Sequence, residues 1–153
     1  MLTSIEGNFD NPKVHELLIK HFIELRAASP EGSAHVLDID GLKHSSIKFW
    51  SLWKNKMLIG CGALKFLDNN HGEFKSIRVH DSFRSKGFGA VVINHLITEA
   101  KRLDIKQLSI ETGAGDFFIP ARKLFKNCGF EECEPFAHYK KDINSIYLTK
   151  FIS

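Results

Sequence analysis

The sequence predicts a mixed α/β fold in which helices cover a curved, mostly antiparallel sheet. The 153 residues are 43% hydrophobic and 25% charged, which is enough apolar surface for a folded core. Helical and strand-like patterns also alternate along the chain, which argues against an all-β or all-helical fold. We expect about six to seven strands and about four helices. At roughly 100 to 200 residues per domain, the length favours one domain over residues 1–153.

The first third of the chain predicts one strand, one helix and a long loop. A short strand is expected at 2–6, and Asn11-Pro12 provides an N-cap and a first helical position. Apolar residues then recur at helical spacing, which predicts a helix over 12–27. Residues 28–46 are rich in turn formers and hold at most one helical turn. A loop of this length suggests a functional role.

Three strands are expected next, at 47–53, 57–67 and 72–79. Lys54-Asn55-Lys56 and the segment 68–71 separate them as hairpin turns, so neighbouring strands should pair antiparallel. Trp50 and Trp53 lie three positions apart and should therefore point to opposite faces of the first of these strands. We expect one of the two to lie in the core.

The last third predicts two helices and three strands. Apolar residues between Gly87 and Leu103 share one face, which is typical of an amphipathic helix. Alternation predicts a strand over 106–111, and a short helix should follow, with Pro120 at its first position and Gly129 just past its end. Two strands, near 130–133 and 146–151, complete the expected fold.

Composition excludes several classes of function. There are 21 Lys and Arg against 18 Asp and Glu, a net charge of +3, which is below the strongly basic range of most nucleic-acid-binding domains. The longest apolar run, 57–64, is much shorter than the roughly 18 to 20 residues of a membrane span. The N-terminus has no basic region of a secretory signal. We therefore expect a cytoplasmic protein with no nucleic-acid or membrane partner.

The cysteines and histidines do not predict a metal site. Three cysteines, with no Cys-x-x-Cys spacing, favour neither disulfides nor a zinc ribbon. His15 and His21 are six positions apart on the expected helix, so they point in different directions and cannot share a metal ion. We expect no bound metal.

A candidate anion site lies where the strand 72–79 leads into the amphipathic helix. The connecting loop carries Arg84 and Lys86, and Gly87 and Gly89 open the helix. Unpaired N–H groups at a helix N-terminus can hold a pyrophosphate when glycines allow close approach. The alternative is that the glycines only shape a tight turn.

A dinucleotide-binding fingerprint is a second alternative for the same glycines. Glu111 follows Gly89 at about the distance of a ribose-binding acid. However, Val92 occupies the third glycine position, and the preceding strand carries charged residues such as Glu73 where a central parallel strand would be apolar.

Two motifs within the segment 72–130 carry a family resemblance. The first is Arg84-Ser-Lys-Gly-Phe-Gly89, and the second is Ala121-x-x-Leu-Phe-x-x-Cys-Gly-Phe130. The segment resembles the central region of the GNAT superfamily of N-acetyltransferases, whose acetyl-CoA loop has the pattern Arg/Gln-x-x-Gly-x-Gly/Ala and whose later segment has the pattern Ala-x-x-Leu-Tyr-x-x-x-Gly-Phe. The order of expected elements is that of the GNAT fold, and further segments resemble a group of small bacterial acetyltransferases of poorly defined substrate.

The resemblance implies that acetyl-CoA is the co-substrate. Backbone groups of Ile77 and Val79 would bind the pantetheine arm, and 85–90 would cradle the pyrophosphate. The strands should splay after Val79 and Glu111 to admit the thioester. The residues expected to bind acetyl-CoA are Ile77, Arg78, Val79, Arg84, Ser85, Lys86, Gly87, Phe88, Gly89, Ala90, Phe118 and Phe125.

The resemblance also implies direct acetyl transfer to a primary amine, most simply of a small molecule. Glu73 stands four residues before Ile77, with the same strand parity, at the position of a general-base glutamate in some family members. The alternative for Glu73 is an exposed carboxylate paired with Lys75 or Lys65. Dimers are common in the family, so a homodimer is a further expectation.

The chain departs from the family pattern at two positions. Phe125 replaces the tyrosine that protonates the leaving thiolate in many members, so a water molecule, Tyr139 or no general acid must serve. Phe118 replaces an asparagine that helps to hold the co-substrate, so that contact must differ or be absent. These departures leave an alternative function, an acyl-CoA-binding regulatory module with little or no turnover.

Overall fold

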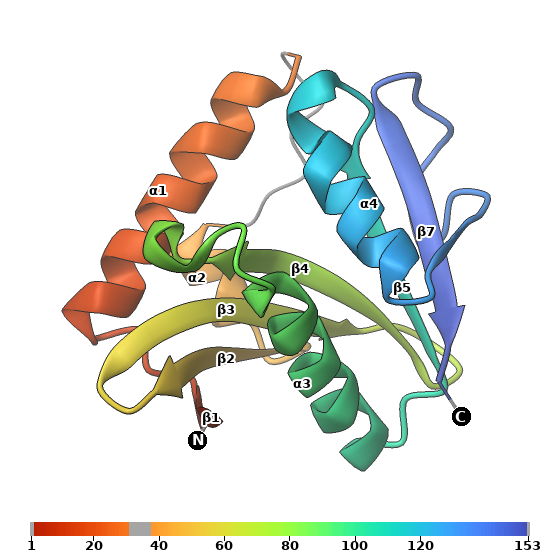
Figure 1. Cartoon of the computed structure of the whole chain (residues 1–153). Coiled ribbons are helices and arrows are strands. Elements are labelled where there is room, and N and C mark those ends of the chain that lie inside the picture. Colours follow the sequence, from red (N-terminus) through yellow and green to blue (C-terminus); the bar gives the residue numbers. More distant parts are fainter. Residues whose placement is uncertain (1, 31–37, 153) are drawn as a thin grey trace.

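The computed structural model describes residues 2–30 and 38–152. Within them, seven strands form one sheet in the order β1-β2-β3-β4-β5-β7-β6, and β4 and β5 form its parallel pair (Figure 1). The expected mixed α/β fold with a mostly antiparallel sheet is confirmed. The strands are β1 (Leu2–Glu6), β2 (Ile47–Lys54), β3 (Met57–Phe66), β4 (His71–Val79), β5 (Gln107–Gly113), β6 (Glu131–Glu132) and β7 (Ser145–Phe151). The helices are α1 (Pro12–Ala28), α2 (Ile39–Leu42), α3 (Phe88–Arg102) and α4 (Ile119–Asn127), with short 3-10 turns η1 (Asp81–Phe83) and η2 (Asp116–Phe118).

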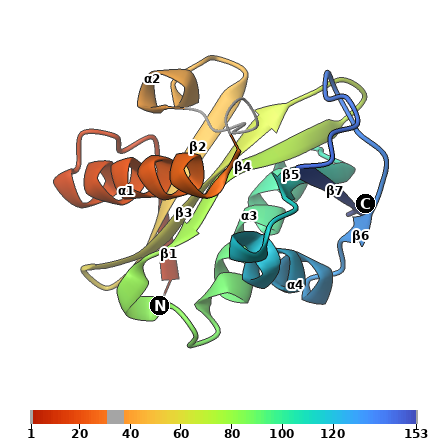
Figure 2. The same cartoon turned by 90° about the horizontal axis from the view of Figure 1, so that it is seen from above.

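Helices α1 and α2 cover one face of the sheet (Figure 2). The Asn11 side chain caps α1 by accepting a hydrogen bond from the Lys13 N–H at 2.9 Å. Val14, Leu18 and Phe22 of α1 are buried against apolar residues of β2 and β3. α2 supplies the single helical turn expected within 28–46, and residues 31–37 of that segment lie outside the described residues.

Helices α3 and α4 cover the opposite face, over a second and larger apolar core (Figure 2). Trp50 belongs to this core and Trp53 to the core under α1, so the two tryptophans point to opposite faces as expected. Both are buried, at 4% and 8% exposed. The expectation of a single core tryptophan was wrong because helices cover the sheet on both faces.

Strand β4 contains a β-bulge that reverses its side-chain alternation. The register with β3 shifts between the pairs Ala63–Lys75 and Cys61–Arg78, and Ser76 has a φ of 54°. As a result Phe74 and Ile77 both contact the core under α3, although regular alternation would place them on opposite faces. The expectation that Glu73 and Ile77 share a face was therefore wrong.

Strands β4 and β5 pair over only three residues. His71 to Glu73 pair with Gln107 to Ser109, and beyond these residues the two strands diverge (Figure 1). A short contact of 2.6 Å joins His71 Nε2 to Ser109 Oγ at the paired end. The splay expected only after Val79 and Glu111 thus begins near the start of β4.

Candidate active site

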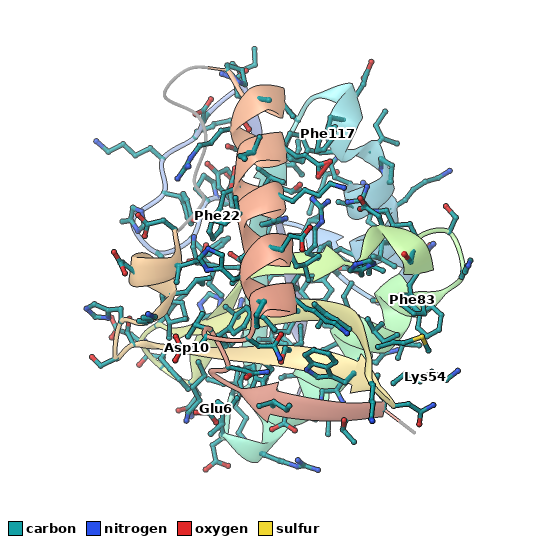
Figure 3. The ribbon with its side chains drawn as sticks, turned by 90° about the vertical axis from the view of Figure 1, so that its left-hand side faces the viewer. Glu6, Asp10, Phe22, Lys54, Phe83 and Phe117 are labelled. Carbon is teal, nitrogen blue, oxygen red and sulfur yellow. The ribbon has the colours of Figure 1, made fainter. Side chains whose placement is uncertain are left out.

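The divergence of β4 and β5 creates a cavity of about 470 Å³. Glu73, in the last residue pair before the strands part, lies at its closed end. The lining comes from α1 (His21, Leu25, with Ser29 beyond its end), β4 (residues 73–79), Arg84, β5 (residues 110–113), and η2 and α4 (Phe117, Phe118, Pro120, Ala121, Leu124 and Phe125). Figure 3 looks onto α1 and labels Phe117 near the C-terminal end of this helix.

Glu73 is a buried carboxylate with two donors on one oxygen. Its side chain is 2% exposed, and Oε2 accepts hydrogen bonds from the Tyr139 hydroxyl at 2.6 Å and from Lys75 Nζ at 3.2 Å. Oε1 is shielded from solvent and has no hydrogen-bond partner among the described residues. The alternative of an exposed Glu73 is therefore wrong, although its pairing with Lys75 is observed. Lys65 lies opposite Glu73 in the β3–β4 register.

Tyr139 reaches Glu73 from the segment between β6 and β7. Its ring stacks on His138 at 4.7 Å and contacts the rings of Phe136 at 5.2 Å and Tyr147 at 5.7 Å. Burial, and then the charge of Glu73 and the hydrogen bond to it, raise the pKa of the Tyr139 phenol well above its usual value near 10. The hydroxyl therefore keeps its proton and donates a hydrogen bond to Glu73. It does not contribute to the lining of the 470 Å³ cavity.

The loop before α3 has the backbone expected of an anion site. Gly87 is the N-cap of α3 with a φ of 84°, and no side chain caps the helix at this residue. Ser85, two residues earlier, also has a positive φ of 60°. Gly89 has a different role, since a Cβ there would lie 2.6 Å from Leu124 Cδ2 of α4 and would force this side chain to shift. Gly87 thus shapes the turn, and Gly89 allows α4 to pack against α3.

The predicted co-substrate residues fall into two groups. Those that line the cavity are Ile77, Arg78, Val79, Arg84, Phe118 and Phe125. The residues 85–90 lie outside the lining, in the loop and first turn of α3. Within the second group, Phe88 packs edge-on against Phe83 at 5.1 Å.

Arg78 is directed toward α1 rather than toward the glycine loop. Its side chain is 3% exposed, forms an ion pair with Glu24 of α1, and contacts Asp81 at 3.1 Å. Asp81 also pairs with Lys20 and, at 3.3 Å, with Arg84. This charge network joins α1 to the segment that connects β4 with α3.

Among the lining side chains that sequence reasoning did not assign to a site are His21 and Glu111. His21 is 5% exposed, and burial followed by the charge of Arg78 lowers its pKa to about 4, so it is neutral at pH 7. Glu111 of β5 faces the cavity and accepts a hydrogen bond from Ser145 Oγ at 2.7 Å. No local pattern in the sequence indicated that a cavity adjoins His21.

Residues 2–30 and 38–152 contain no group of three His, Cys, Asp or Glu side chains placed to hold a metal ion. Their helices are too short or too polar to cross a membrane. The three cysteines are all free thiols.

Sequence and structure comparisons agree on one family. The family model for the acetyltransferase (GNAT) family matches residues 12–130. The chain is 44% identical to the uncharacterized N-acetyltransferase YsnE of Bacillus subtilis, over 90% of this chain and 91% of that protein. It is 35% identical to the uncharacterized N-acetyltransferase YedL of Escherichia coli, over 97% and 94%. A Bacillus subtilis acetyltransferase solved in complex with CoA has a TM-score of 0.72 at 20% identity and covers 99% of each chain. The chain therefore belongs to the GNAT family of acetyltransferases.

Proposed function

We propose that this single-domain acyltransferase moves an acetyl group from acetyl-CoA directly to a primary amine of a small molecule. The observation that carries the proposal is the buried carboxylate of Glu73 at the closed end of the cavity between β4 and β5. An amine is mostly protonated near neutral pH, so its attack on a thioester requires a proton acceptor close to the reacting atoms.

Three features of the chain favour acetyl-CoA as the acetyl donor. Beyond Glu73, β4 has no partner on β5 among the described residues, so backbone groups of Ile77 and Val79 are available to an extended pantetheine arm. The first N–H groups of α3, with Arg84 and Lys86 nearby, suit a pyrophosphate. The fold is shared with an acetyltransferase that binds CoA.

The transfer needs no covalent enzyme intermediate. Glu73 takes a proton from the acceptor ammonium, and the neutral nitrogen then attacks the thioester carbonyl. The C–N bond forms, the C–S bond breaks, and CoA leaves as a thiolate. The second proton of the former ammonium, which the nitrogen still carries after the attack, passes to this thiolate directly or through water. Phe125 lines the cavity and has no proton to give. A thiol with a pKa of about 8.5 is a good enough leaving group to depart without a general acid.

Substitution of Glu73 by Gln tests this role. We expect turnover at saturating amine to fall about 10²- to 10⁴-fold, the range that general-base catalysis supplies, with acetyl-CoA affinity unchanged. Glu132→Gln, at an exposed position on β6, is the matched control and should retain full turnover. Equal activity of Glu73→Gln and wild type at limiting pH would remove Glu73 from the mechanism.

A broad amine panel separates this enzyme from the alternative, an acyl-CoA-binding regulatory module. Phe118 and Phe125, which stand where family members often have Asn and Tyr, favour that alternative. Acetyl-CoA should raise the melting temperature by several degrees in either case, because ligand at about 100 times its Kd stabilises by roughly 2.7 kcal/mol. CoA release with at least one amine supports the enzyme, and binding without turnover across the panel supports the module.

A further inference from the structure

We propose that Lys75 and Tyr139 are positioning residues for the general base: together they hold Glu73 as an anion through Oε2 and leave Oε1 to take the proton of the acceptor ammonium. This inference rests on the proposed function. It adds to that function a separate role for each of the two carboxylate oxygens, and it gives Tyr139 a role other than that of a general acid.

The three side chains form a closed triangle of polar contacts. The Tyr139 hydroxyl and Lys75 Nζ both donate to Glu73 Oε2, at 2.6 and 3.2 Å, and Nζ lies 3.1 Å from the Tyr139 hydroxyl. The Glu73 and Lys75 side chains are 2% and 10% exposed. A carboxylate this deeply buried is costly unless a cation and hydrogen-bond donors compensate its charge. Lys75 supplies the cation, and Tyr139 supplies the shorter hydrogen bond.

The two donors are held by independent parts of the fold. Lys75 lies two residues from Glu73, just before the bulge at Ser76, so β4 itself fixes their spacing. Tyr139 comes from a segment 66 residues away, where the rings of Phe136 and Tyr147 support it. Two fixed donors define one orientation of the carboxylate, which a base needs if it is to meet the proton in reactive geometry.

Occupation of Oε2 determines which oxygen acts. Two donors already engage Oε2, whereas Oε1 has no hydrogen-bond partner in the described part of the chain. The lone pairs of Oε1, which accept no hydrogen bond from the described residues, are therefore the ones that can bind a new proton. The raised pKa of Tyr139 fits this arrangement, because a phenol that keeps its proton can donate to Oε2 throughout the reaction.

The pH dependence of kcat/KM for the amine tests the inference. Lys75→Met and Tyr139→Phe each remove an interaction that favours the anionic base, so the acidic limb of the profile should move to higher pH by about one unit or more. Activity should approach that of wild type at high pH, where the base is ionised in every variant. Lys75→Arg retains a cation and should keep the limb near its wild-type position.

Two matched controls separate positioning from damage to the fold. Lys65→Met removes a lysine that lies opposite Glu73 on β3. Tyr147→Phe removes a hydroxyl from the same aromatic cluster, one that donates to the Lys140 carbonyl at 2.8 Å. Both controls should leave the acidic limb in place. Acetyl-CoA should raise the melting temperature of all these variants as it does that of wild type.

The outcomes distinguish this inference from the proposed function. An unmoved limb in Lys75→Met and Tyr139→Phe, or a uniform loss of activity at every pH, would overturn the positioning role while Glu73→Gln still lowers turnover. Full activity of Glu73→Gln would instead overturn the general base itself, and the positioning role with it.

Discussion

Substitution of Glu24 by Gln should destabilise the protein more than its partly exposed position suggests. The Glu24 side chain is 32% exposed, but its partner, the Arg78 guanidinium, is 3% exposed. Loss of the carboxylate charge therefore leaves a buried cation with less compensation, and an uncompensated buried charge is expensive. Asp81 continues to contact Arg78 at 3.1 Å in the variant, although Asp81 also forms ion pairs with Lys20 and Arg84.

The expected loss of stability is about 2 kcal/mol. Complete removal of one partner of a buried ion pair costs about 3 to 5 kcal/mol. The glutamine keeps an oxygen that can accept a hydrogen bond and Asp81 keeps part of the pairing, so we take roughly half of that range. For a chain of this length, about 2 kcal/mol corresponds to a fall of about 4 to 8 °C in Tm.

Thermal unfolding at pH 7 measures this effect against a matched surface pair. Glu6→Gln breaks a 3.3 Å contact between Glu6 and Lys48, whose side chains are 58% and 35% exposed, respectively. Loss of this exposed pair should lower the free energy of unfolding by less than about 1 kcal/mol. Equal Tm shifts for Glu24→Gln and Glu6→Gln would show that the buried guanidinium does not depend on Glu24, and would refute the reasoning.

Three further predictions concern pH and backbone conformation. Burial and the charge of Arg78 lower the pKa of His21 to about 4, so the unfolded chain binds a proton first as the pH falls below about 6.5, and stability is lost between pH 6.5 and 4. His21→Gln should therefore flatten the profile of Tm against pH in that window, and an unchanged slope would contradict the prediction. The hydrogen bond from Lys20 and the nearby cations lower the pKa of Asp81 below its ordinary 3.8, so its contribution to stability is present above pH 3.8 and disappears as the pH falls further. In Asp81→Asn, this fall of Tm with decreasing pH should be lost, as measured between pH 2 and 5. Gly87 has a φ of 84° and no heavy atom within 4 Å of an added Cβ, so Gly87→Ala should cost about 1 to 2 kcal/mol through backbone strain alone. Gly87→Asn should cost less in the same urea titration, and equal losses would point to a cause other than φ.

Most elements of the fold could be predicted because their signals are local. Asn11-Pro12 marks the start of α1, apolar spacing outlines α3, and Gly129, with a φ of 95°, follows the end of α4 as expected. The hairpins between β2, β3 and β4 also follow from turn residues, such as Asn55 with its φ of 55°. In each case the residues that determine the element lie within it or beside it.

The bulge in β4 could not be predicted from the same kind of signal. It is centred on Ser76, and residues 73–79 contain neither glycine nor proline. The positive φ of Ser76 coincides with a shift in the register against β3. Period-two alternation predicted that Glu73 and Ile77 share a face. The prediction fails because the bulge at Ser76 interrupts the alternation between them. A bulge that lacks glycine and proline leaves little trace in the strand's own sequence.

The contact between Tyr139 and Glu73 is beyond sequence reasoning for a different reason. It joins residues 66 positions apart and depends on the path of an irregular segment after β6. Glu73 and Lys75, by contrast, are two residues apart on a strand, and that spacing alone predicts a common face. The sequence therefore offered the pairing of Glu73 with Lys75 as one alternative, and it named Tyr139 as a candidate without predicting its contact with Glu73.

The sheet consists of two slabs that are joined through the three-residue contact between β4 and β5. One slab holds β1 to β4 and the other holds β5 to β7, and beyond Glu73 and Ser109 no backbone hydrogen bonds of the described ladder cross between them. A molecule bound in this gap would contact both slabs at once and would hold them together. The resistance of the folded protein to unfolding, and with it the lifetime of the protein in a cell, would then depend on the supply of the molecule that fills the gap.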